Sequence, residues 1–502
     1  MPLLSVPRPR RLALAVLALA ASAPAFAQVP DDPLRVVPAQ ARVGIERVTL
    51  PGDEHMGLVG TTYLIDIGRG FSGGPAAYGA ISGRRGGLFT VGAELAWRRR
   101  LAGALDLDLG FYAGGGGGGA APVGGGLMLR PHADLLWDFG PYRAGVSFSR
   151  VRFANGEIDS RQLGLVWSAN TDFRYVPGDR IGQRSDTGGR SGMGFDRVQA
   201  VWGVYKPRSG PMRVSGGPLD QRIAFVGARL EHALGNHAYW GIEASGAASG
   251  GVAGYAEYLA TLGVETAVWS DVLVLGARTS LGMGGGGDVD VGGGLLLKGG
   301  VYGTVRLTRD LGLTLEAGLT GAPQGRFRAV HGAASLNWIL DDPSDLTAPP
   351  RNARTEWLAG VERYDAQRQD GTRRALQSVV LEVHRFVAPR LYLAGHVHSG
   401  AGGVAGGYTA GMFGIGTQWP IGRRVHVGAE ALIGAAGGGG VETQGGAVAK
   451  PSAYVGVRLS PSTAVRVAAG RIRSLRGSGG LDSGTLDLAL VFDFGVAGRS
   501  YR

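Results

Sequence analysis

Three basic side chains occupy equivalent positions in three segments of the chain, each shortly after a run of glycines. A spacing of four places each of them on the same face of an extended strand as a second polar or aromatic residue. The pairs are Arg130 with Asp134, Lys298 with Tyr302, and Lys450 with Tyr454. Rings of Arg or Lys around an aqueous passage favour anions. We therefore expect these six residues to line a pore and to favour anionic solutes. The alternative is that they are ordinary interior residues, balanced by inward acids at positions Glu94, Asp106, Asp108, Glu265 and Glu430.

Two histidines, His396 and His398, lie two residues apart and therefore share one strand face. Such a pair could ligate a metal ion, but the sequence assigns no third ligand. The corresponding segments of the other two copies, near Ile67 and Ala244, have no histidine. We interpret the pair as isolated interior side chains and expect no metal site, no cofactor and no enzymatic activity.

The glycine runs 114–119, 284–287 and 437–440 match a phosphate-binding loop only trivially. A true phosphate loop needs a helix and a lysine in a fixed context after it, and none follows here. We expect flexible loops in which the absence of a Cβ atom permits close approach. No nucleic-acid partner is indicated.

The amino-acid composition indicates that the basic residues and histidines described above lie on β-strands. The chain has 91 glycines among 502 residues, and 44% of its residues are hydrophobic. Glycine at this level argues against long helices, and the hydrophobic content argues against disorder. The absence of cysteine excludes disulfides, thiolate metal sites and a cysteine nucleophile.

Apolar and polar residues alternate in many short segments, as in Leu105-Asp106-Leu107-Asp108-Leu109. This period of two predicts strands with one apolar and one polar face. The pattern recurs in three internal repeats of about eight strands, at about 41–168, 196–340 and 355–494, which gives about 22–24 strands in all. Tight turns alternate with longer glycine-rich or charged loops.

Aromatic residues mark the ends of equivalent strands beside the tight turns. They are Trp97, Trp269 and Trp419 in mid-repeat, and Trp167, Trp338 and Phe492 at the repeat ends. Amphipathic rings favour a membrane interface, so we expect an aromatic girdle at this rim. Buried core positions would be the alternative.

The N-terminus is typical of an exported protein. Residues 1–27 combine a basic start, a short apolar run and an Ala-Phe-Ala cleavage site, which predicts a signal peptide. We expect residues 28–40 to form a periplasmic N-terminal segment and 495–502 to form a C-terminal tail.

Taken together, these features resemble Gram-negative outer-membrane β-barrel proteins as a general class. The resemblance implies an antiparallel up-and-down transmembrane barrel in the outer membrane. It also implies the lipid bilayer, lipopolysaccharide and the outer-membrane assembly machinery as partners. One departure is that such barrels usually end on an aromatic residue, whereas this chain continues past Phe494.

Two architectures fit the repeats. One barrel over 41–494 would have a wide lumen, whereas three eight-stranded barrels would have to fill narrow interiors with side chains. Because many inward positions are Gly, Ala, Ser or Thr, we expect the single barrel. It predicts a pore or export channel, with anionic solutes or polysaccharide as possible cargo. The alternative function is an assembly or adhesion barrel that binds partners through its outer loops without an open pore.

Overall fold

The computed structural model describes residues 33–183, 192–269, 272–341 and 351–498. These residues are almost entirely antiparallel β structure, with two short 3-10 turns at Pro51–Asp53 and Gly178–Arg180. None of the helices in the described ranges is long and apolar enough to cross a membrane. The predicted signal peptide, residues 1–27, lies outside the described residues.

Twenty-four strands are present in the described part of the chain. The first eight are β1 (Arg35–Leu50), β2 (Glu54–Gly68), β3 (Phe71–Ser82), β4 (Phe89–Ala102), β5 (Leu105–Gly117), β6 (Met128–Asp138), β7 (Tyr142–Phe153) and β8 (Asp159–Pro177). The next eight are β9 (Arg197–Pro207), β10 (Ile223–Ala233), β11 (Ala238–Ala247), β12 (Ala256–Trp269), β13 (Leu273–Gly285), β14 (Leu295–Arg306), β15 (Leu311–Gly321) and β16 (Arg328–Ile339). The last eight are β17 (Arg351–Gln367), β18 (Arg373–Phe386), β19 (Leu391–Gly402), β20 (Thr409–Ile421), β21 (Val425–Gly437), β22 (Ala447–Ser460), β23 (Thr463–Ser474) and β24 (Asp482–Gly498).

The strands close into three separate barrels, so the prediction of one wide barrel over 41–494 is wrong. β1 pairs with β8, β9 with β16, and β17 with β24, and each closure is a long antiparallel ladder. We call these sheets the first, second and third barrel. Within the described residues, the only strand pairing between the first and third barrels is a two-residue bridge, which joins Val176 and Pro177 to Gly495 and Phe494.

The small inward residues misled the prediction because they lie beneath large side chains. A Cβ atom added to Gly60 would lie 2.2 Å from the ring of Tyr78, and one added to Gly203 would lie 2.2 Å from the ring of Phe225. A Cβ atom added to Gly416 would likewise lie 2.2 Å from the ring of Tyr392. A glycine on one strand thus makes room for an aromatic ring from another, and the interiors are filled rather than wide.

The ends of the barrels also differ from the predicted boundaries. Residues 35–40 belong to β1 and pair with β8, so only part of the predicted N-terminal segment 28–40 precedes the barrel. Residues 495–498 continue β24 and pair with β17, so the predicted tail 495–502 is partly strand. Residues 28–32 and 499–502 lie outside the described residues. The ladders are longer than predicted because pairing continues past the last clearly alternating residues.

Turns and loops alternate around each barrel as the sequence predicts. One rim carries tight connections, such as 139–141 between β6 and β7 and 461–462 between β22 and β23. The other rim carries longer loops, such as 208–222, 286–294 and 438–446. We call these the short-turn rim and the long-loop rim.

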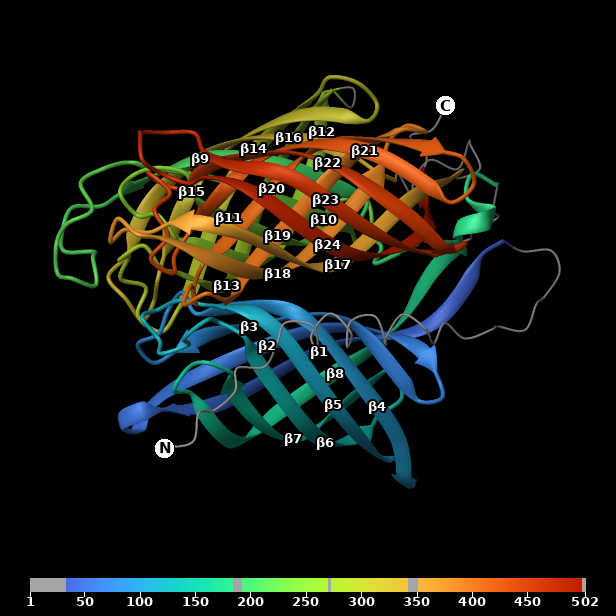
Figure 1. Ribbon diagram of the computed structural model, residues 1–502, viewed down its shortest axis with the longest axis horizontal. Coiled ribbons are helices and arrows are strands. Elements are labelled where there is room, and N and C mark those ends of the chain that lie inside the picture. Colours follow the sequence, from blue (N-terminus) through green and yellow to red (C-terminus); the bar gives the residue numbers. More distant parts are fainter. Residues whose placement is uncertain (1–32, 184–191, 270–271, 342–350, 499–502) are drawn as a thin grey trace.

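The three barrels contact one another in a cyclic arrangement. β5 of the first barrel contacts β19 of the third, β13 of the second contacts β3 of the first, and β21 of the third contacts β11 of the second. Each barrel therefore uses its fifth strand against the third strand of its neighbour. In Figure 1 the first barrel, blue to teal, is seen beside the other two, which overlap in this view.

Candidate functional site

The outer walls of the barrels are apolar. Large side chains point outward along the strands, including Leu163 at 72% exposed, Val301 at 64% and Leu315 at 63%. Charged side chains turn inward on the intervening positions, as Glu316 does beside Leu315. An apolar outer wall around a closed antiparallel sheet is the architecture of an outer-membrane β-barrel, because lipid surrounds it and no strand edge is left unpaired.

The predicted girdle residues lie on the outer wall close to the short-turn rim. Trp269 is 70% exposed, and Trp167, Trp419 and Phe492 are between 41% and 44% exposed. Trp97 and Trp338 are half-buried. Trp269, Trp338 and Trp419 lie within two residues of a strand end at this rim, where a ring can reach the membrane interface. Strands β4, β8 and β24 continue for five to ten residues past Trp97, Trp167 and Phe492.

In the first barrel, Arg130 points inward and is 6% exposed. Its Nε and Nη2 atoms donate to the two carboxylate oxygens of Glu46 at 2.9 and 3.0 Å. Asp134, the second predicted residue, pairs instead with Arg42, which also lies 3.6 Å from Glu94. The two predicted residues thus belong to consecutive ion-pair layers along the same lumen.

In the second barrel, Lys298 lies between two carboxylates. Its Nζ atom is 2.7 Å from Glu243 Oε1 and 3.0 Å from Glu257 Oε1. Glu243 also accepts from Arg229, with 2.6 Å between Nη2 and Oε2. Tyr302 donates its hydroxyl to Glu265 at 2.7 Å, closer to the short-turn rim.

In the third barrel, Lys450 is 1% exposed, and its Nζ atom lies 2.6 Å from Glu362 Oε1 and 3.0 Å from Asp487 Oδ2. Tyr454 lies closer to the short-turn rim than Lys450 does, and its hydroxyl receives a hydrogen bond from Tyr392 at 3.0 Å. All six predicted pore residues therefore face an interior, but they line three different lumens. A single three-point cationic ring does not form.

Each lumen is closed at the long-loop end by an apolar cluster. In the second barrel this cluster includes Tyr205, Phe225 and Phe327, together with Met212 and Leu219 from the loop 208–222. The other two barrels hold similar clusters, around Tyr112 and Phe153 and around Tyr364 and Tyr408.

Little space remains below the apolar cluster of the first barrel. A cavity of about 20 Å³ lies in the first barrel between Arg42, Glu46, Tyr78, Glu94 and Arg130. This volume is enough for about one water molecule. In this conformation, the charged layers of the first barrel pack against one another.

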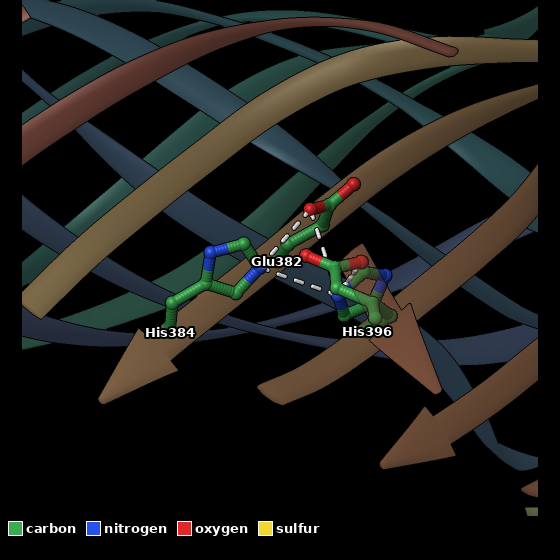
Figure 2. Close-up of side chains that lie close together, drawn as sticks. Glu382, His384 and His396 are labelled. Carbon is green, nitrogen blue, oxygen red and sulfur yellow. Dashed lines mark hydrogen bonds and ion pairs between the residues drawn. The ribbon is translucent and has the colours of Figure 1, made fainter. Parts of the chain in front are cut away.

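The third barrel also contains a cluster of two histidines and two glutamates. Glu382 and His384 come from β18, His396 from β19 and Glu430 from β21, and all four are buried. Figure 2 shows Glu382, His384 and His396 converging from neighbouring strands. His398 lies apart from this cluster and pairs with Glu362, with 2.6 Å between Nδ1 and Oε2. His396 is therefore not isolated, contrary to the sequence-based interpretation.

The sequence indicated several of the inward acids but not the inward basic residues that pair with them. It identified Glu94, Asp106, Asp108, Glu265 and Glu430 as inward acids, and all five are inward in the structure. It did not single out the inward cations Arg42, Arg229 and Arg466, or His384. The three arginines could have been found from their period-two positions, since each lies between two apolar residues. Only strand pairing shows which charges meet.

Comparisons with known proteins give no family. No protein-family model matches the sequence, and no curated protein matches it. Among solved structures, the outer membrane protein OpdK from Pseudomonas aeruginosa is 10% identical and has a TM-score of 0.23, over 92% of this chain and 98% of that one. The siderophore receptor PirA from Acinetobacter baumannii is 9% identical and has a TM-score of 0.28, over 93% of this chain and 81% of that one. TM-scores this low carry no argument about architecture or function, which rest on the barrels themselves.

Proposed function

We propose that this protein is a gated channel of the Gram-negative outer membrane, with three narrow lumens that are closed at rest. The observation that carries the proposal is that ionisable side chains line each lumen in successive layers. Above them lies the apolar cluster at the long-loop end, built partly from loops, which we call the lid. Buried ion pairs contribute little net stability compared with apolar packing of the same volume. Ionisable groups at membrane depth therefore point to a function such as ion passage.

Several interior cations have more than one acidic partner. Lys298 contacts Glu243 and Glu257, and Lys450 contacts Glu362 and Asp487. Such a cation can move from one carboxylate to another without becoming unpaired, which lowers the cost of opening a layer. The proposed channel opens by partner exchange together with movement of the lid.

The lid of the second barrel is held by contacts between two loops. Asp288 accepts hydrogen bonds from the Ser215 backbone N–H at 3.0 Å and from its hydroxyl at 2.6 Å, and lies 3.6 Å from Arg213. Partial burial raises the pKa of Asp288, but these hydrogen bonds and the nearby arginine outweigh it and hold the pKa below its ordinary value. This contact stabilises the lid at neutral pH and is lost as the pH falls below about 4.

In the proposed channel, anion preference arises at the mouth and not from a ring in the lumen. The interior cations are matched by carboxylates, whereas Arg208, Arg222 and Arg476 are exposed on the long-loop rim. Basic side chains at an entrance raise the local concentration of anions. We propose small anionic solutes as the favoured cargo.

Conductance of the purified protein in planar bilayers tests this function. We expect brief, small steps at neutral pH and more frequent openings below about pH 4, because the Asp288 contact is then lost. Asp288→Asn should open more often at neutral pH and should respond less to acid. Asp370→Asn is the matched control, since the Asp370 side chain hydrogen-bonds mainly within its own turn, to Thr372. Silence of the folded wild type and of Asp288→Asn at both pH values would reject the channel.

A second candidate function is a sealed barrel that binds lipopolysaccharide or polysaccharide through its outer face. It is favoured by hydrogen bonds that join the loops of different barrels into one platform. The Gly86 N–H donates to the Gly292 carbonyl at 3.0 Å, and the Gly406 N–H donates to the Gly124 carbonyl at 2.9 Å. Electrical silence combined with saturable binding of lipopolysaccharide would favour this function.

A further inference from the structure

The histidine–glutamate cluster inside the third barrel has the composition and spacing of a metal centre. We propose that Glu382, His384, His396 and Glu430 bind a divalent transition-metal ion, with Zn²⁺ as the best fit. This site does not depend on the proposed channel activity. No second group of this kind occurs in the described part of the chain.

The distances within the cluster are those of a tetrahedral site. The two imidazole Nε2 atoms are 3.4 Å apart. His384 Nε2 lies 3.4 Å from Glu382 Oε2 and 3.2 Å from Glu430 Oε1, and His396 Nε2 lies 3.6 Å from an oxygen of each glutamate. Four ligands at the usual zinc distances of about 2.0–2.1 Å are separated from one another by about 3.3–3.4 Å. An ion at the centre therefore requires small movements of the four side chains together with displacement of the Arg466 guanidinium, whose Nη1 atom lies 3.5 Å from His384 Nε2.

The surroundings of His384 direct its Nε2 lone pair toward the centre. Nδ1 of His384 lies 3.1 Å from Glu356 Oε2, so an N–H on Nδ1 leaves the lone pair of Nε2 facing the other ligands. A carboxylate behind a ligating histidine is the usual partner that fixes its tautomer. Nδ1 of His396 is buried without a hydrogen-bond partner, and its Nε2 also faces the cluster. The Nε2 atoms of two imidazoles and the oxygens of two carboxylates thus converge on one point.

Arg466 is the cation that already neutralises part of this cluster. Its guanidinium pairs with Glu382 and lies 2.8 Å from Glu430 Oε1. With both imidazoles neutral, as ligands to a metal must be, one guanidinium beside two carboxylates leaves one negative charge uncompensated within this group. A divalent ion would supply that charge and would compete with Arg466 for the carboxylate oxygens.

The ligand set selects among metals. Two imidazoles and two carboxylates suit Zn²⁺ and its neighbours in the first transition row, whereas Mg²⁺ and Ca²⁺ prefer oxygen ligands alone. The four side chains are between 0% and 6% exposed, so the ion would enter as the barrel folds. Metal binding would then be coupled to barrel formation.

The test uses untagged full-length protein refolded into detergent with Zn²⁺, followed by removal of free metal and elemental analysis. We expect one zinc per chain, and we expect Co²⁺ to give the intense visible absorption of a tetrahedral site. His396→Gln and Glu430→Gln should lower the zinc content at least tenfold. His331→Gln is the matched control, because His331 is an equally buried histidine of the second barrel beside Glu316.

A variant with the opposite expected effect guards against simple misfolding. Arg466→Gln removes the competing cation and should tighten zinc binding at least tenfold, with barrel formation checked by heat-modifiable gel migration. The proposal is overturned if the folded wild type retains no zinc. It is also overturned if His331→Gln and His396→Gln lose zinc equally, or if Arg466→Gln leaves the zinc affinity unchanged or weakens it.

Discussion

At the scale of single residues, the interior charges form chains in which several acids serve more than one cation. Glu316 is shared by Arg229 and Arg278, and Glu231 by Arg197 and Arg278. Removing one partner from a buried pair is costly because the remaining charge stays buried and uncompensated. Loss of one carboxylate should therefore disturb more than one layer.

Glu243 offers the sharpest test of this sharing, because it neutralises both Arg229 and Lys298. Glu243→Gln should lower the free energy of unfolding by about 3–5 kcal/mol, the usual effect of breaking a buried pair. Urea unfolding in detergent, followed by tryptophan fluorescence, measures it. The control is Glu157→Gln at an exposed position on the long-loop rim. An equal loss in both variants would contradict the shared network.

The direction of these side chains could be predicted from the sequence, but their partners could not. Period-two alternation is enough to place Lys298 inside a barrel. It contains no information about which strands lie across the lumen, so Glu243 and Glu257 could not be chosen as partners. For the same reason the sequence did not predict the histidine–glutamate cluster, whose residues come from β18, β19 and β21.

At the scale of strands and loops, the polyglycine segments serve as contact surfaces between barrels. A Cβ atom on Gly437, at the end of β21, would lie 2.3 Å from the Gly254 nitrogen of the second barrel. One on Gly87 of the first barrel would lie 2.3 Å from the Gly286 nitrogen of the second. The glycines are needed because the backbones of two barrels approach too closely for any side chain.

Gly437→Val should therefore separate the second and third barrels without unfolding either one. Gly411→Val is the matched control, since Gly411 lies in β20 with open space around its Cβ position. Spin labels at Leu307→Cys and Leu459→Cys, both exposed near the short-turn rim, report the separation in a chain that has no native cysteine. The distance should lengthen in Gly437→Val alone. An unchanged distance in Gly437→Val would contradict the contact.

Strand positions were predictable because alternation and turn residues mark them locally. The predicted second repeat, at about 196–340, matches the span from the start of β9 to the end of β16 within one residue at each end. Sheet closure was not predictable in this way. Whether β8 pairs with β1 or β9 depends on how the lumen is filled, and glycines beneath Tyr78 and Tyr392 resemble those of an empty lumen until the rings are placed.

At the scale of the whole molecule, one chain builds a cyclic group of three barrels. Each barrel closes its own ladder of hydrogen bonds, so no strand edge faces lipid. The glycine contacts on the long-loop rim then hold the barrels together. This arrangement provides three narrow lumens in place of one wide one, and the proposed gating acts on each lumen separately.

Engineered disulfides across the barrel seams test this architecture most directly, because the chain has no cysteine of its own. Ile45 and Leu165 are register partners between β1 and β8, and Val361 and Leu488 are partners between β17 and β24. Paired outward positions on adjacent strands lie within disulfide reach. Three barrels predict that both cysteine pairs cross-link in the folded protein, whereas cysteines at Leu165 and Val204 do not. A single barrel would instead cross-link Leu165→Cys with Val204→Cys and Ile45→Cys with Leu488→Cys, and would leave the two seam pairs unlinked. That result would contradict the three-barrel architecture.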